Sequence, residues 1–139
     1  MTNDGTMTVK REGGCLCGAV RYSVTGEPLR SGICHCTDCR QAGGSAFSFY
    51  AIWPREAFTG EGTISSYKGR SFCPSCGSRL YSLTADEAEI LVGSLDEAPS
   101  KLVPEYELWI FRREEWLHGL PWATQFEQNR PDPEQDKSS

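Results

Sequence analysis

The sequence predicts a single, mainly β domain built from short strands. Two segments, 20–25 and 47–53, alternate apolar and polar residues, which indicates strands with one buried face. Two further short segments, 89–95 and 106–111, are bounded by turn residues and are also typical of strands. Helical signals are scarce, and 139 residues is a normal length for one domain.

The predicted elements follow one another with clear stop signals. In the first strand Val20, Tyr22 and Val24 share one face, and the Gly-Glu-Pro segment that follows ends it. The second strand ends at a proline, which cannot donate to a sheet ladder. Thr37 is the candidate N-cap of one short helical turn, which the glycine pair at 43–44 terminates.

We expect the folded domain to span residues 13–126, between two disordered tails. Residues 1–12 lack hydrophobic periodicity. Residues 127–139 are dominated by Pro, Asp, Glu, Lys and Ser, a composition that buries too little apolar surface to fold. The domain between them contains no internal repeat of solenoid length, so we expect one structural unit.

Composition and charge narrow the possible classes of function. The chain is 38% hydrophobic and 24% charged, and it has no apolar run near the roughly 20 residues that a membrane-spanning helix needs. Its first residues lack the apolar region of a secretory signal, so we expect a cytoplasmic protein without a membrane partner. The net charge of −5 would repel phosphate backbones, so we expect no nucleic-acid partner.

Seven cysteines in three clusters are the most informative feature of the sequence. An odd number of cysteines in a reducing compartment disfavours a disulfide framework and favours metal ligation. In a Cys-x-x-Cys-Gly turn, two thiolates point at one ion while backbone amides donate to the sulfurs. The clusters are a Cys-x-Cys pair, a Cys-x-Cys-x-x-Cys triple and a Cys-x-x-Cys-Gly turn, at Cys15 and Cys17, at Cys34, Cys36 and Cys39, and at Cys73 and Cys76.

Ligand counting divides these clusters into two sites. Structural zinc takes four ligands, so pairing the first cluster with the last gives a closed tetrathiolate that clamps the N-terminal strand to a distant turn. The triple then leaves a fourth position open, which is the arrangement of catalytic zinc sites. All-thiolate donors favour zinc, although ligand type alone leaves iron open. We therefore expect two zinc ions, one structural at Cys15, Cys17, Cys73 and Cys76 and one catalytic at Cys34, Cys36 and Cys39.

Two other interpretations of the triple stay open from the sequence. His35 could supply a fourth ligand, but a residue between two ligating cysteines on a strand points to the opposite face, so we expect it to pack or hydrogen-bond nearby. Alternatively, Cys36 and Cys39 form a Cys-x-x-Cys redox pair, which spacing by itself does not exclude.

Three stretches, GCLCGAVRY, CHCTDCRQAGGSAF and FCPSCGSRLY, resemble in this order the glutathione-dependent formaldehyde-activating enzyme family, also called the centromere protein V/GFA domain. The resemblance covers most of the chain, from residue 13 to about 125. It implies a zinc-stabilised β-tent fold of short antiparallel strands, with the structural and catalytic ligands divided as the counting predicts. It also implies a carbon–sulfur lyase that condenses formaldehyde with glutathione to S-(hydroxymethyl)glutathione.

Glutathione is anionic, so its carboxylates need donors close to the metal. Arg40 and Gln41 directly follow Cys39, and Gly43, Gly44 and Ser45 offer backbone amides on a loop close to the metal, so this stretch is the best candidate for a pocket wall. Within it we expect Arg40, Gln41, Gly44 and Ser45 to bind the substrate. Two alternatives to the lyase remain: a zinc-structured protein-binding module without catalysis, and a thiol enzyme that resembles methionine sulfoxide reductase. The latter needs a nucleophilic cysteine outside the clusters, and the sequence has none.

Overall fold

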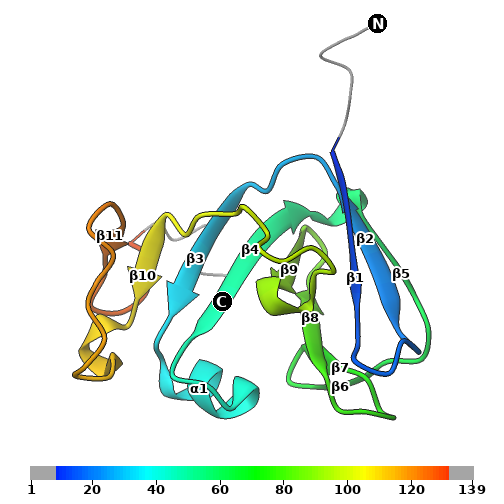
Figure 1. Cartoon of the computed structure of the whole chain (residues 1–139), viewed down its shortest axis with the longest axis horizontal. Helices are drawn as coiled ribbons and strands as arrows, with labels where there is room; N and C mark the ends of the chain where they lie inside the picture. Colours follow the sequence, from blue (N-terminus) through cyan, green and yellow to red (C-terminus); the bar gives the residue numbers. More distant parts are fainter. Residues whose placement is uncertain (1–8, 132–139) are drawn as a thin grey trace, which may run out of the picture.

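The structure, a computed structural model, describes residues 9–131, which form two β-sheets (Figure 1). The smaller sheet has three antiparallel strands in the order β1-β2-β5, with β1 at Lys10–Gly14, β2 at Arg21–Thr25 and β5 at Phe58–Glu61. The mainly β prediction is confirmed. Within residues 9–131, no helix combines the length and the apolar character that a bilayer-spanning segment requires.

The larger sheet has eight strands in the order β11-β10-β3-β4-β9-β8-β7-β6. Neighbouring strands are antiparallel, except that β10 pairs in parallel with both β3 and β11, so the parallel pairings are confined to one edge. The strands are β3 (Arg30–Cys34), β4 (Ser48–Pro54), β6 (Ser65–Tyr67), β7 (Arg70–Phe72), β8 (Arg79–Leu83), β9 (Glu87–Leu91), β10 (Tyr106–Leu108) and β11 (Thr124–Gln125). The helical elements are α1 (Thr37–Gly43) and the 3-10 turns η2 (Arg55–Ala57), η3 (Val92–Ser94) and η4 (Ile110–Arg112).

Strand β4 is buried on both of its faces. Ala51 and Trp53 have no exposed surface and belong to the larger cluster of buried residues. Tyr50 and Ile52 alternate with them and belong to a second cluster, because successive side chains of a strand point to opposite faces of the sheet. The large sheet therefore separates two packing layers.

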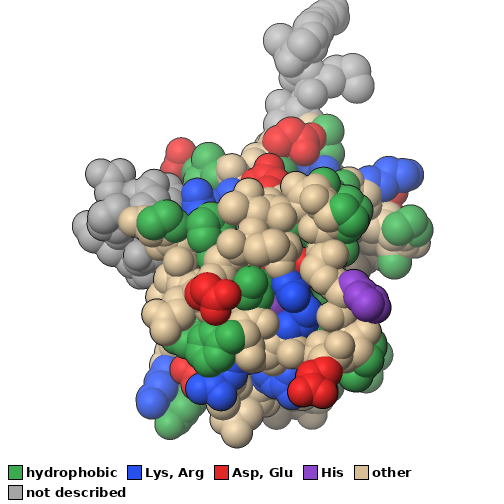
Figure 2. All heavy atoms as spheres, turned by 90° about the vertical axis from the view of Figure 1, so that its left-hand side faces the viewer, with side chains coloured by type: hydrophobic (Ala, Val, Ile, Leu, Met, Phe, Trp, Pro, Cys, Tyr) green, Lys and Arg blue, Asp and Glu red, His purple; other side chains and the backbone are tan. Residues whose placement is uncertain are grey.

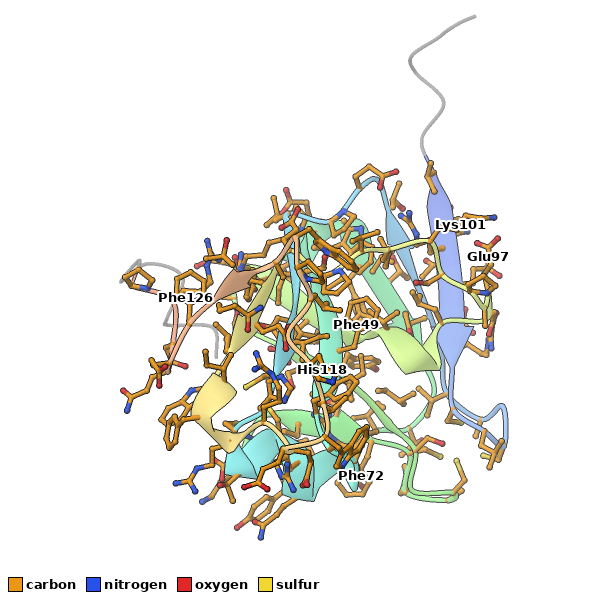
Figure 3. The ribbon with its side chains drawn as sticks, turned by 60° about the vertical axis from the view of Figure 1, so that its left-hand side comes forward. Phe49, Phe72, Glu97, Lys101, His118 and Phe126 are labelled. Atoms are coloured by element: carbon orange, nitrogen blue, oxygen red, sulfur yellow. The ribbon has the colours of Figure 1, made fainter. Side chains whose placement is uncertain are left out.

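The larger cluster lies between the two sheets, and both contribute to it. Val20 and Val24 come from the small-sheet side, and Leu80 and Ile90 come from the large sheet. The second cluster lies on the other face, towards β10, and includes the cysteine at the end of β3. Figure 3 shows Phe126 at the far edge of the large sheet, where its ring packs edge-on against β10. The two packing layers on either side of the large sheet thus consist of different residues.

The first two predicted strands are confirmed, and the last two are shorter than predicted. Strand β9 ends at Leu91 because the hydroxyl of Ser94 donates to the Leu91 carbonyl and a 3-10 turn follows. Strand β10 ends at Leu108 because Trp109 adopts a left-handed φ of 56°. Neither event has a local sequence signal, since a non-glycine residue rarely takes a positive φ.

The ends of the domain differ in detail from the predicted boundaries. Strand β1 begins at Lys10, inside the segment predicted to be a tail, because it pairs along its whole length with β2. At the other end, Gln128 and Asn129 both accept hydrogen bonds from Trp109, one at its backbone amide and one at its indole. The remainder of the two predicted tails, 1–8 and 132–139, lies outside the described residues.

A buried acid–base pair joins the parallel edge of the large sheet. His35 and Glu107 are 2% and 3% exposed, and His35 Nε2 lies 2.7 Å from Glu107 Oε1. The backbone amide of Leu120 and the side chain of Gln125 donate to the other carboxylate oxygen. Burial alone would raise the pKa of Glu107, but these hydrogen bonds hold the pKa below its ordinary value.

We expect Glu107→Ala to lower the free energy of unfolding by about 3 to 5 kcal/mol, because it leaves His35 buried without its partner. Urea denaturation of the zinc-loaded protein measures the change. The matched control is Asp96→Ala, which removes the exposed ion pair with Arg21 and should cost at most about 1 kcal/mol. Equal losses in the two variants would mean that the buried pair does not hold this edge.

Candidate metal centre

Four cysteines from two distant turns meet in one cluster. Cys15 and Cys17 lie in the β1–β2 turn, Cys73 and Cys76 lie in the β7–β8 turn, and their sulfurs lie within 4.8 Å of one another. The Sγ atoms of Cys15 and Cys17 are 3.6 Å apart, and those of Cys17 and Cys73 are 3.8 Å apart. A tetrahedral zinc with sulfurs at about 2.3 Å separates its ligands by about 3.8 Å. The geometry fits a tetrathiolate zinc.

The backbone around this cluster is arranged to stabilise thiolates. The amide of Val20 donates to Cys15 Sγ at 3.2 Å, and the amide of Ser75 donates to Cys73 Sγ at 3.3 Å. Such N–H donors spread the negative charge of metal-bound sulfurs. Gly77 turns the chain with a φ of 82°, which a residue with a side chain rarely adopts. The Cys-x-x-Cys-Gly sequence therefore supplies both the ligands and the turn that orients them.

The other three cysteines form a second cluster at the start of α1. Cys34 ends β3, Cys36 precedes the helix and Cys39 lies in its first turn, and the three sulfurs lie within 4.8 Å of one another. Cys36 is the N-cap, because its sulfur accepts a hydrogen bond from the Cys39 amide at 3.3 Å. The prediction that Thr37 caps the helix is therefore wrong by one residue. The helix cap and the three-cysteine cluster share the same sulfur.

The electrostatics of this cluster call for a cation. Hydrogen bonds from Cys34 and Cys39 lower the pKa of Cys36 to about 2. In return, the contact with the Cys36 thiolate is the main cause that raises the pKa of Cys34 to about 12, and the pKa of Cys39 is raised as well. Three thiolates this close repel one another, so only a bound cation allows all three to ionise. Soft sulfur donors suit zinc.

His35 points away from the three sulfurs, as predicted. Its ring contacts Glu107 on the opposite side of the strand, and it is not part of the cluster. All seven cysteines are free thiols, including Cys36 and Cys39, for which the sequence leaves a redox pair open. Among residues 9–131 the second cluster therefore offers three protein ligands and leaves a tetrahedral ion one further position.

The second cluster lines a cavity of about 670 Å³. Its far wall comes from the β6–β7 turn, from β7, β8 and β9, and from the loop that follows β10, so segments distant in sequence enclose it. Figure 1 places α1 and the β6–β7 turn at the same end of the molecule. Besides Cys34, Cys36 and Cys39, the charged and aromatic lining residues are Asp38, Tyr50, Lys68, Arg70, Arg79, Glu89, Trp109 and Arg112.

The four residues that the sequence assigns to substrate binding lie beside the cavity but are not part of its lining. The guanidinium of Arg40 contacts the carbonyls of Ala46 and Arg112 and the carboxylate of Glu114, so it ties α1 to the loop after η4. The neighbouring Gly43, in contrast, lines the cavity. The others, Gln41, Gly44 and Ser45, are exposed, and Gly44 is the C-cap of α1.

Most residues of the opposite cavity wall are not recognisable from the sequence. Arg70, Arg79 and Glu89 have ordinary strand neighbours, and nothing local marks them as cavity residues. The available signal is alternation in β9, where Ala88 and Ile90 are fully buried and Glu89 between them must face the other way. That pattern predicts a polar face but not a cavity.

We expect Cys73→Ser to abolish the cooperative unfolding transition, whereas Cys36→Ser keeps the fold and loses one zinc equivalent. The reason is that structural zinc affinity, on the order of 10 to 16 kcal/mol, is folding free energy. Circular dichroism during thermal unfolding, together with the zinc-to-protein ratio, checks both expectations. Equal destabilisation by the two substitutions would make the three-cysteine cluster structural.

The chain is similar to known proteins in sequence and in fold. A protein of Schizosaccharomyces pombe, named as an uncharacterized lyase, is 32% identical over 75 residues, which are 50% of this chain and 55% of that protein. The chain thus spans about half the length of this curated relative. A crystal structure of a Rhodobacter sphaeroides protein shares the fold, with a TM-score of 0.50 and 22% identity over 67% of this chain and 97% of that chain. Residues 10–112 match the family model, and the chain therefore belongs to the glutathione-dependent formaldehyde-activating enzyme family.

Proposed function

We propose that the chain is a carbon–sulfur lyase that adds a small thiol, such as glutathione, to formaldehyde or a related aldehyde. The observation that carries the proposal is the position of the three-cysteine cluster, whose members all line one cavity of about 670 Å³. A cavity of this size accommodates a tripeptide-sized thiol. The family membership and the yeast relative's name as a lyase support the same class of reaction.

The donor set of the cluster suits a catalytic zinc. Zinc held by Cys34, Cys36 and Cys39 would supply an open position that lowers the pKa of a ligating thiol. Beside the cluster, Leu108 and Trp109 give the cavity an apolar surface that can pack against the uncharged parts of a substrate. The chain thus presents ligands and a binding surface at one place.

The charge of the cavity favours a thiol that carries carboxylates. Four cationic and two acidic side chains line it, although the whole chain has a net charge of −5. Burial lowers the pKa of Arg79, and its Nε atom is buried without a hydrogen-bond partner among the described residues. A substrate carboxylate would satisfy such a donor. The cations are Lys68, Arg70, Arg79 and Arg112.

The sequence-based assignment of substrate binding to Arg40, Gln41, Gly44 and Ser45 stays a competing proposal for the same carboxylates. Arg40 would have to exchange its contacts with Glu114 and two carbonyls for a substrate contact. In the cavity wall, Arg79 Nε has no hydrogen-bond partner among the described residues, so it could bind a carboxylate without giving up an existing contact. We therefore favour the cavity wall as the carboxylate site.

A protein-binding module without catalysis is the second candidate. Exposed aromatic residues favour it, since Phe111, Trp116 and Trp122 are 52%, 69% and 61% exposed. On the face shown in Figure 2, hydrophobic side chains alternate with basic and acidic ones and do not form one continuous apolar surface. None of the three aromatic residues lines the cavity, so a protein-binding function would not explain why the three-cysteine cluster faces a cavity.

Thiol binding to the open cluster tests the lyase directly. We expect glutathione to change the visible spectrum of the cobalt-substituted protein at the three-cysteine site and to leave the tetrathiolate bands unchanged, because only the open site can accept a further sulfur. The control ligand is S-methylglutathione, which keeps the carboxylates but cannot form a thiolate. If the methylated analogue binds equally well, or neither ligand changes the spectrum, thiol activation at the cluster is wrong.

The same titration separates the two carboxylate assignments. We expect Arg79→Gln to raise the Kd of glutathione by about 10-fold or more, the value of one charge-assisted hydrogen bond, because Arg79 Nε is the unpartnered donor of the cavity wall. We expect Arg40→Gln to change this Kd by less than about threefold. The reverse order would place the carboxylates at the α1 side of the site.

A further inference from the structure

Glu89 is placed inside the cavity by the geometry of β9. Its neighbours Ala88 and Ile90 have no exposed surface and pack between the two sheets. The alternation of the strand turns Glu89 to the other face, where it lines the same cavity as the three-cysteine cluster. In the sheet, Glu89 lies opposite Ile52 of β4 on one side and Ser82 of β8 on the other. A carboxyl group therefore faces the space that the substrate would occupy.

The carboxyl of Glu89 has no partner of its own. Among residues 9–131 it makes no hydrogen bond and no ion pair. Burial raises its pKa to about 7, and nearby arginines keep the pKa from rising further. The charged and titratable groups that face it are Arg79 of β8, Arg70 of β7, Arg30 of β3, Tyr50 of β4 and Glu87 of its own strand. Near neutral pH such a group exchanges its proton readily.

The other titratable groups of the cavity are less suited to carry a proton. Asp38 is exposed and already has an ion-pair partner, because its carboxylate lies 4.0 Å from the guanidinium of Arg70. Burial raises the pKa of Tyr50, whose hydroxyl is within 3.1 Å of the Tyr106 hydroxyl. The three cysteines are candidate ligands. Glu89 is therefore the one unpaired acid among the described cavity residues.

We propose that Glu89 is the proton-transfer residue of the reaction, taking the proton that the thiol loses and delivering it to the aldehyde oxygen. This inference rests on the proposed lyase function. In the synthesis direction the sulfur–carbon bond forms, the π bond of the carbonyl breaks and its electron pair moves to oxygen. The proton from sulfur then becomes the proton of the new hydroxyl, so atoms and electrons balance without a co-reactant. In the reverse direction Glu89 removes the hydroxyl proton and returns it to sulfur.

The test substitutes Glu89→Gln, which keeps the size of the side chain and removes its acid. We expect kcat to fall by about 10²- to 10⁴-fold, the usual contribution of a positioned proton carrier, with zinc content and the glutathione-induced cobalt spectrum unchanged. The rate is measured by exchange NMR between free and adducted thiol, above the uncatalysed rate. Wild-type kcat/KM should rise with pH through about 7, as Glu89 ionises, and this rise should vanish in the variant.

Two further variants make the result decisive. Asp86→Asn removes an exposed carboxylate just before β9 that is outside the cavity lining, and its rate should match the wild type. Glu89→Asp keeps an acid, so it should retain part of the rate and the pH dependence even if the glutamine variant fails to fold. If Glu89→Gln is folded and as fast as the wild type, or Glu89→Asp loses the pH dependence, the role of Glu89 is overturned. If the wild type itself does not accelerate exchange, the lyase proposal fails as well.

Discussion

The fold depends on one connection between two turns that are far apart in sequence. The sulfurs of Cys17 and Cys73 meet although 56 positions separate these residues. One turn closes the β1–β2 hairpin of the small sheet and the other joins β7 to β8 in the large sheet. A zinc ion shared by the two turns would fix the sheets against each other at this end, and the buried apolar cluster between them would then continue the contact. The binding free energy of such a metal would add to the free energy of unfolding.

The two faces of the large sheet have different surroundings: one packs against the small sheet, and the other lines the cavity. On the face towards the small sheet its strands bury apolar side chains, among them Ala51, Trp53 and Ile90. On the other face the same strands present Tyr50 and Glu89 to the cavity beside the three-cysteine cluster. Because successive side chains of a strand point to opposite faces, the same strand contributes to the buried layer and to the cavity wall. We therefore expect substitutions on the cavity face to leave the packing between the two sheets unchanged.

The sequence predicts the parts of this arrangement that are local. The spacing of the cysteines and the four ligands that zinc requires predict one cluster of four cysteines and one of three, since a metal site depends on few residues with a fixed geometry. Strand alternation around Tyr22 and Ala51 is also visible locally. The cap at Cys36 is missed because a sulfur is an unusual cap, and the end of β10 is missed because Trp109 takes a rare backbone conformation. The cavity wall is missed for another reason: its cations and Glu89 converge only through long-range strand pairing, which no local pattern encodes.

The cysteines of this chain divide into one closed and one open thiolate site for zinc. Anomalous diffraction above and below the zinc absorption edge, from crystals of the reduced, zinc-loaded protein, locates the ions and their ligands. We expect two zinc peaks, one bound by Cys15, Cys17, Cys73 and Cys76 and one bound by the three remaining cysteines and a ligand that does not come from the chain. A single zinc peak, or a second zinc whose fourth ligand is a protein side chain, would contradict it.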